Sequence, residues 1–196
     1  MATKATPMGA EPVGTTSASG SFSGKTRYIP IKSAEGTSIF YGDFVKLVLA
    51  GGVVTVAKDT GTTTLTPVGV FLGCTYTDPN TKQTTFAQSY NTSIAADDIN
   101  AIVLDDPNVE FRMQADGAVA KGKIGSNIAV VQTAGSTDLG RSKNALDAST
   151  AATTNTLPIR ILGFVESGES TPGDAFTDLI VKFNAGMHAY DKPLGT

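Results

Sequence analysis

Apolar and polar residues alternate strictly from Val109 to Asp116, and no other feature constrains the fold of this chain as much. The apolar members are Val109, Phe111, Met113 and Ala115. A period of two places one set on a buried face and the other set in water, as in a half-buried β-strand. The segment Asn100–Leu104 precedes it, and Asp105-Asp106-Pro107-Asn108 between them has turn chemistry, because Pro fixes φ and Asp and Asn bond their own backbone. We therefore predict a hairpin over residues 100–116.

Turn signals divide the rest of the sequence into further short strands. Gly51-Gly52 separates two apolar runs and supplies the positive φ values of a tight hairpin turn. Gly69 and Gly73 inside the strand predicted at Pro67–Thr77 indicate a bulge or a close neighbouring backbone. The other predicted strands are Tyr28–Lys32, Thr84–Tyr90, Ile128–Thr133, Leu157–Val165 and Asp178–Asn184. One helical turn is expected at Ile94–Asp98 and another in the Gly- and Lys-rich stretch 116–127. Residues 134–156 are expected to form a long polar loop.

About nine strands spaced by turns predict an all-β protein, an antiparallel sandwich or barrel of jelly-roll-like form. Charged residues make up only 17% of the chain, below the roughly 25% of ordinary globular domains. Many Thr and Val residues with little charge suit strands that have neighbours on more than one side.

The first 27 residues differ from the rest in composition, which divides the chain into an extended low-complexity arm (1–27) and a β-rich core domain (28–196). The arm consists mostly of Thr, Ser, Gly, Ala and Pro, with isolated Met8, Val13 and Phe22. Ordering one residue costs roughly 1–2 kcal/mol of backbone entropy, which three isolated apolar side chains cannot offset. We therefore expect the arm to become ordered against other chains, for example by strand addition.

A basic group lies where the arm meets the core. Lys25, Arg27 and Lys32 could contact an acidic partner surface, or they could be solvated strand ends. The residues predicted to contact a partner are Met8, Val13, Phe22, Lys25 and Arg27. The net charge of −3 argues against nucleic-acid binding, which needs a basic stripe.

Several short motifs resemble nucleotide or metal sites but lack the required context. Residues 19–26, SGSFSGKT, nearly match a phosphate-binding loop, but Ser19 replaces the first Gly and no amphipathic helix follows. Gly117–Lys123 has the spacing but continues with Ile124. The pairs Asp97-Asp98 and Asp105-Asp106 lack the alternating oxygen ligands of a calcium loop. We predict Gly-rich loops and turn-forming or capping Asp residues, with no metal and no cofactor.

Nucleophilic catalysis is also not predicted. His188 is the only histidine, so any triad would have to use it, and no Gly-x-Ser-x-Gly elbow presents a serine. We interpret His188 as a surface or interface residue and the chain as a non-enzyme. Cys74 is the only cysteine and is expected to be a small buried hydrophobe. No apolar run reaches the length of a membrane-spanning helix, and no secretory signal is expected at the N-terminus.

Strand and turn patterns over roughly residues 39–188, and not chemical signatures, give the chain a family resemblance. The segments that carry it are Pro67–Gly73, Asp105–Pro107 through Met113–Gly117, Gly140–Ser142 with Leu146-Asp147, Arg160–Gly163 and Val181–Asn184. In these segments the chain resembles capsid decoration (cement) proteins of tailed bacteriophages, notably those of marine podovirus type.

The resemblance implies a β-rich virion protein, often a homotrimer, on the outer surface of the capsid at junctions between major capsid proteins. It implies neither enzyme activity nor a cofactor. A cement protein strengthens a shell with many modest contacts, at roughly 25 cal/mol per Å² of buried apolar area, and several arms of one trimer would bind together. The alternative is a phage tail or spike module that recognises a host surface carbohydrate, for which an exposed aromatic platform would be needed.

Overall fold

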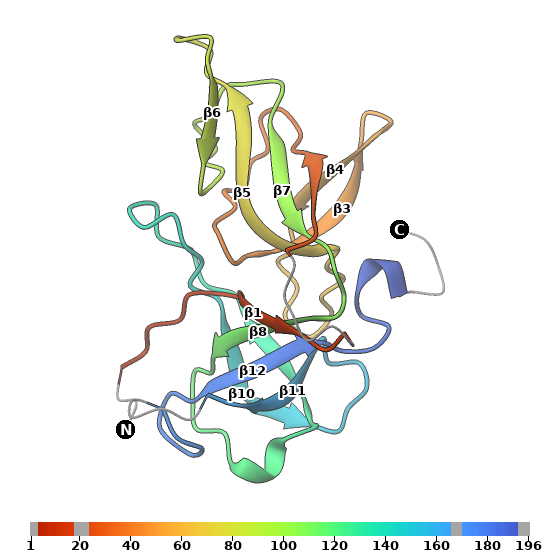
Figure 1. The fold of residues 1–196 in the computed structure, drawn as a ribbon, viewed down its shortest axis with the longest axis vertical. Coiled ribbons are helices and arrows are strands. Elements are labelled where there is room, and N and C mark those ends of the chain that lie inside the picture. The colour runs from red at the N-terminus through yellow and green to blue at the C-terminus, as the bar shows by residue number, and fades with distance from the viewer. Residues whose placement is uncertain (1–3, 18–23, 166–169, 192–196) are drawn as a thin grey trace.

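The computed structural model describes residues 4–17, 24–165 and 170–191, and within these ranges the protein is built almost entirely of β-strands (Figure 1). The strands are β1 (Glu11–Thr15), β2 (Thr26–Pro30), β3 (Phe44–Ala50), β4 (Val53–Lys58), β5 (Gly69–Thr77), β6 (Thr84–Ala87), β7 (Asn100–Leu104), β8 (Val109–Gln114), β9 (Asn127–Val131), β10 (Ala145–Ala152), β11 (Ile159–Phe164) and β12 (Asp178–Phe183). Two short 3-10 helices, η1 (Lys121–Lys123) and η2 (Ala189–Asp191), complete the described elements. The predicted all-β class is confirmed.

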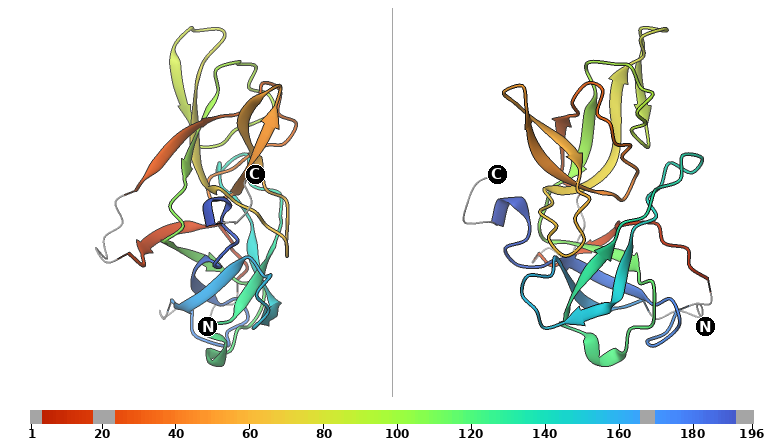
Figure 2. Two further views of the ribbon diagram at one scale, coloured as in Figure 1. Left: turned by 90° about the vertical axis from the view of Figure 1, so that its right-hand side faces the viewer. Right: turned by 180° about the vertical axis from the view of Figure 1, so that it is seen from behind.

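The strands form two antiparallel sheets, which lie one above the other along the long axis (Figures 1 and 2). Sheet A has the order β1-β8-β12-β11-β9-β10, and we call the part built on it, residues 4–17 and 109–183 where described, lobe A. Sheet B has the order β2-β7-β5-β3-β4 with β6 beside β5, and residues 24–104 form lobe B. Sheet B curls until a bridge between Ile31 and Val56 links its first and last strands.

Lobe B is inserted into lobe A, because the chain enters and leaves it along paired strands. β1 pairs with β8 in sheet A, and β2 pairs with β7 in sheet B. The strands β7 and β8 therefore belong to different sheets, and the predicted hairpin over residues 100–116 is wrong. Both strands were placed correctly, but the turn at residues 105–108 carries the chain from one lobe to the other. The domain boundary expected after residue 27 falls inside β2.

Two features of lobe B follow directly from glycine. β3 and β4 form the predicted hairpin, with Gly51 and Gly52 at φ +60° and +82° in its turn. β5 has the predicted bulge, where its pairing with β7 shifts between Phe71 and Gly73. A Cβ on Gly69 would lie 2.2 Å from the carbonyl oxygen of Leu104, so a second backbone passes as close as expected.

The protein has two apolar cores, and the core of lobe A also takes in four buried residues of lobe B, which are Phe44, Leu65, Val70 and Leu104. The core of lobe A is lined by the buried face of β8, as the alternation in this strand predicts: Val109, Phe111 and Met113 are at most 1% exposed. Phe183 on β12 joins it to lobe B, because its ring lies 5.5 Å from that of Phe111 and 5.7 Å from that of Phe44. Cys74 is buried in the core of lobe B, as predicted, and burial raises the pKa of its thiol to about 11.

Two local predictions are wrong. Residues 134–156 contain β10, which pairs with β9 and so is not a loop. Its sequence, ALDASTAA, offers no apolar alternation that would distinguish a strand. Residues 94–98 form no helical turn. The helical turn expected within residues 116–127 is confirmed as η1.

Candidate partner-binding surface

The described part of the N-terminal segment, residues 4–17, lies along lobe A of its own chain. Strand β1 is the edge strand of sheet A, and Ala10 is fully buried in the core of that lobe. The backbone N–H of Ala10 donates to the carbonyl oxygen of Gly42 at 2.9 Å. The extended course is as predicted, but the arm is no separate unit that orders only on foreign chains. Long-range contacts within the chain stabilise it, and composition does not reveal those.

A glycine permits the closest of these contacts. Gly9 has a φ of +73°, in the left-handed region that favours glycine. A Cβ there would lie 2.5 Å from the carbonyl oxygen of Gly42 and 2.6 Å from the Cβ of Ser142. The N-terminal segment therefore crosses lobe B and the 136–144 loop at a point where no side chain fits.

A buried carboxylate orders the loop under this crossing. Asp43 is fully buried, and its Oδ1 accepts hydrogen bonds from the Ser142 hydroxyl at 2.6 Å and the Asn144 amide at 3.1 Å. Its Oδ2 accepts from the Phe40 backbone N–H at 2.9 Å and lies 3.0 Å from the ammonium of Lys58. Four partners thus satisfy the charge, as burial of a carboxylate requires.

Arg141 connects that loop to the N-terminal segment. Its guanidinium forms an ion pair with Glu11, lies over the ring of Tyr41 at 5.1 Å from the centroid, and is 3.5 Å from the sulfur of Met8. The tripeptide Gly140-Arg141-Ser142, noted above only as part of a resemblance, therefore holds the N-terminal segment in place.

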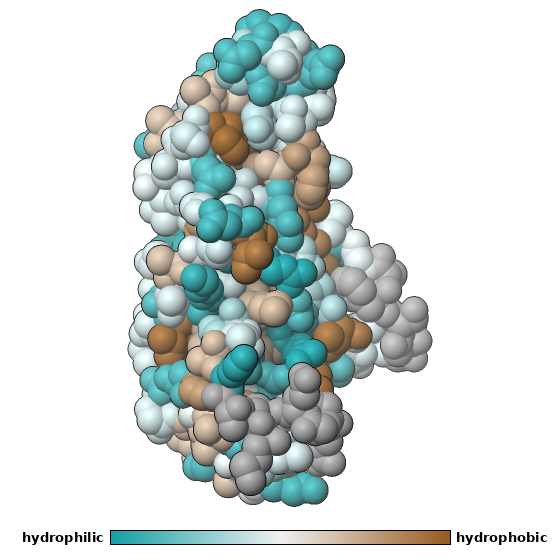
Figure 3. Space-filling model, turned by 90° about the vertical axis from the view of Figure 1, so that its left-hand side faces the viewer, coloured by the Kyte–Doolittle hydropathy of each residue, from teal (hydrophilic) through white to brown (hydrophobic). Residues whose placement is uncertain are grey.

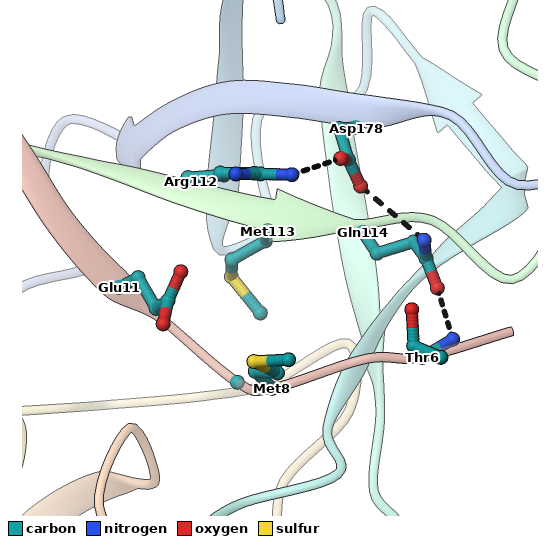
Figure 4. Close-up of a pocket in the computed structure, with 8 residues that line it drawn as sticks. Thr6, Met8, Glu11, Arg112, Met113, Gln114 and Asp178 are labelled. Carbon is teal, nitrogen blue, oxygen red and sulfur yellow. Dashed lines mark hydrogen bonds and ion pairs between the residues drawn. The ribbon is translucent and has the colours of Figure 1, made fainter. Parts of the chain in front are cut away.

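The segment leaves a cleft on each side. The first is lined by a row of hydrogen-bonded polar side chains (Figure 4). The Asp178 carboxylate accepts from Arg112 at 2.5 Å and from Gln114 at 3.3 Å. The Gln114 amide oxygen in turn accepts from the Thr6 backbone N–H at 2.7 Å. The second lies between residues 5–8 and the 136–144 loop and is more apolar. These two segments lie on the left in Figure 1, which is the side of the molecule that Figure 3 shows. Met8, which is 46% exposed, and Leu139, which is 68% exposed, line this second cleft.

The structure places the predicted contact residues in two regions. Met8 and Val13 lie on lobe A, and Val13 is 51% exposed. Lys25 and Arg27 lie at the start of lobe B, and Lys25 is exposed. Phe22 lies outside the described residues. We define the N-terminal surface as Met8, Val13 and Leu139. Leu139 was missed because a single Leu in a polar loop carries no signal.

Arg27 has a partner within the chain. It forms an ion pair with Asp105, which is 2% exposed, and its guanidinium lies 5.3 Å from the centroid of the Tyr190 ring. The Tyr190 hydroxyl also donates to Asp105, at 3.2 Å. Arg27 therefore stabilises the junction between the lobes, where the turn at residues 105–108 crosses.

His188 is fully buried at the same junction, so its interpretation as a surface or interface residue is wrong. Its ring lies 5.3 Å from that of Phe183 and 5.2 Å from that of Tyr190, and its Nδ1 accepts from the Tyr190 backbone N–H at 3.2 Å. Burial lowers the pKa of His188, although Asp191 opposes the shift. No described serine or cysteine is placed against it by a hydrogen bond.

Of the four residues in the acidic pairs, Asp106 acts as the predicted turn residue, whereas Asp97, Asp98 and Asp105 bond residues far away in sequence, which are Ser33, Thr77 and Arg27. Asp98 accepts from the Thr77 backbone and hydroxyl at 3.0 and 2.6 Å, and Asp106 accepts from the Asn108 backbone at 2.9 Å. Among the described residues no three His, Cys, Asp or Glu side chains are grouped as metal ligands. Thr26, the end of the phosphate-loop-like stretch, begins a strand and not a helix.

Searches of protein families, curated proteins and solved structures found no match to this chain. In the described ranges no helix is long and apolar enough to cross a membrane.

Proposed function

We propose that this chain is a structural virion protein that decorates and stabilises the capsid of a tailed bacteriophage by bridging major capsid proteins. It would act as a homotrimer on the outer surface of the head, with the N-terminal surface against a neighbouring subunit. The observation that supports this best is the orientation of the N-terminal segment. Its backbone is fixed to lobe A, while Met8 and Val13 face outward.

Side chains, more than backbone pairing, carry the proposed contact. β1 is an edge strand, but it contains Pro12, and its pairing with β8 is interrupted by a bulge between Pro12 and Gly14. Both features limit the addition of a further strand. Met8 and Val13 are about half exposed, so covering the exposed part of each gains roughly half of the 1.5–3 kcal/mol of a fully buried side chain. Three copies in a trimer would add their contacts.

The test is binding to heads assembled from the major capsid protein encoded in the same genome. The unmodified chain should co-sediment with them. Met8→Ser combined with Val13→Ser should weaken binding by about tenfold to a hundredfold, because the contacts of two half-exposed apolar side chains are lost. Leu49→Ser is the matched control, because Leu49 is exposed on the β3–β4 hairpin of lobe B, and it should bind as the unmodified chain does.

Two results would contradict the proposal at different levels. If the unmodified chain does not bind heads, capsid decoration is wrong. If it binds and only the Leu49→Ser variant loses affinity, the chain decorates heads through lobe B and the N-terminal surface is the wrong assignment.

A second candidate is a tail or spike module that recognises a host surface carbohydrate. Exposed aromatic rings favour it, since Tyr28 on β2 is 65% exposed and Phe86 on β6 is also exposed, and such rings can stack on sugars. Immunogold labelling of virions separates the two candidates, because a tail module would label the tail and a decoration protein the head.

A further inference from the structure

A lysine, a carboxylate and an amide meet in a buried site between the lobes. Lys58 ends β4 and Asp43 directly precedes β3, both in lobe B. Asn144 directly precedes β10 and ends the 136–144 loop, which belongs to the stretch of chain that rises from lobe A toward lobe B (Figure 1). Asp43 and Asn144 are fully buried, and the Lys58 side chain is 8% exposed. Three reactive groups from distant parts of the sequence are thus shielded from water together.

One carboxylate holds the amine and the amide at once. The Lys58 Nζ lies 3.0 Å from Asp43 Oδ2, and the Asn144 Nδ2 donates to Asp43 Oδ1 at 3.1 Å. The four-carbon stem of a lysine is flexible, so rotation about its bonds can bring Nζ from Oδ2 toward the amide carbon of Asn144. Holding two reactants on one group turns their encounter into an intramolecular step, which removes much of the entropic barrier to reaction.

The Asn144 amide is oriented and polarised for attack by an amine. Its Oδ1 accepts from the Thr133 backbone N–H at 3.0 Å while its Nδ2 faces Asp43, so both ends of the amide are fixed. A backbone N–H at the amide oxygen stabilises the negative charge that develops there when an amine adds to the carbon. An ion pair of Lys58 with Asp43 alone would need no such amide, and the cost of burying its two charges would offset most of their attraction.

A covalent step between these groups balances without any further reactant. The Lys58 ammonium gives one proton to Asp43, and the neutral Nζ adds to the side-chain carbon of Asn144. A bond from that carbon to Nζ forms, and its bond to Nδ2 breaks with the electron pair leaving on Nδ2. Asp43 passes its proton to the leaving Nδ2 and takes the second proton of Nζ. The products are a secondary amide, one ammonia and a protonated Asp43, and the open cleft lined by Lys58 and Thr133 gives the ammonia a way out.

We propose that Lys58 and Asn144 form an intramolecular isopeptide bond, with Asp43 as the catalytic residue. The bond joins lobe A to lobe B covalently and restricts the unfolded chain as other cross-links do. The inference does not depend on capsid decoration and uses none of the residues of the N-terminal surface.

The experiment is mass spectrometry of the full chain after incubation at neutral pH. The intact mass should be lower than the mass of the sequence by one ammonia. Tryptic digestion should give a branched peptide in which the Lys58 and Asn144 side chains are linked, with no cleavage after Lys58.

Two variants and a matched control assign the roles of the three residues. Lys58→Arg keeps a cation but removes the nucleophilic amine, and Asp43→Asn removes the proton carrier, so each should show the full mass of its own sequence. Lys46→Arg is the control, because the Lys46 side chain is 39% exposed and its Nζ lies 3.9 Å from Asp59. This variant should lose one ammonia as the unmodified chain does.

Two results would overturn the isopeptide bond: an unmodified chain at the full mass of its sequence, or an ammonia loss that persists in Lys58→Arg, which would indicate cyclisation of an asparagine instead. An ammonia loss that persists in Asp43→Asn would overturn the catalytic role of Asp43. Binding to heads is measured separately, so failure of the isopeptide bond and failure of capsid decoration are distinguished.

Discussion

The two ends of the described chain point their larger side chains in opposite directions. The N-terminal segment (4–17) is held by backbone hydrogen bonds and the Arg141–Glu11 ion pair, and its large apolar side chains face outward. The C-terminal strap, residues 184–191, turns His188 and Ala189 inward, and the Ala189 backbone donates to the Pro67 carbonyl at 2.8 Å. Outward apolar groups on a rigid segment favour contact with another molecule, whereas the inward side chains of His188 and Ala189 tie the two lobes together.

The largest expected effect on stability comes from adding one methyl group to the N-terminal segment where it crosses Gly42. Gly9→Ala should lower the free energy of unfolding by about 2–3 kcal/mol, because the left-handed backbone and the overlap with Gly42 both oppose it. Chemical denaturation monitored by circular dichroism measures this. Gly36→Ala is the matched control, since a Cβ at Gly36 meets nothing within 4 Å, and it should change stability little. Equal effects of the two changes would show that the N-terminal segment does not cross there.

The C-terminal strap should make stability depend on pH. Because burial lowers the pKa of His188 in the folded protein, the unfolded chain binds its proton more readily, with a pKa of about 6.5. The stabilisation is therefore present above about pH 6.5 and is lost as the pH falls below it. Melting temperatures between pH 5 and 7.5 should fall on acidification in the unmodified chain and less in His188→Phe, which keeps an aromatic ring. Identical profiles would contradict the buried position of the imidazole.

The smallest expected effect on stability comes from the outward side chains of the N-terminal segment. Met8→Ser and Val13→Ser, the variants expected to weaken head binding, should each lower the free energy of unfolding by no more than about 1 kcal/mol, because about half of each side chain is exposed. The same denaturation measurement checks this. A large loss of stability would mean that these side chains serve the fold of their own chain and are not available to a partner.

Local chemistry predicted individual strands well and their partners poorly. Gly51-Gly52 and the alternation over residues 109–116 identified β3, β4 and β8, because turn conformation and burial period are properties of short segments. The turn between β7 and β8 misled, since Asp105-Asp106-Pro107-Asn108 bends the chain without fixing which strands pair. Strand β10 lacked a pattern altogether.

The candidate surface was predictable only in part. Met8 and Val13 were recognised as isolated apolar residues in a polar segment, and both are exposed. The Arg141–Glu11 pair and the Asp43 cluster join residues about a hundred or more positions apart in sequence, and a single sequence gives no sign of such contacts. The same limit hid His188, whose burial depends on Phe183 and Tyr190 around it.

The insertion of lobe B has a consequence for how this chain can vary. Thr26 and Leu104 are paired neighbours where lobe B begins and ends, and Thr15 and Val109 are paired neighbours where lobe A is interrupted. A short turn between Thr15 and Val109 would close lobe A as an uninterrupted hairpin. Lobe B thus has the geometry of a cassette that recombination could replace without redrawing sheet A. Such an exchange would have to rebuild three ties to lobe A, namely the strap at residues 184–191, the hydrogen bonds of Asp43 and the ring contact between Phe44 and Phe183.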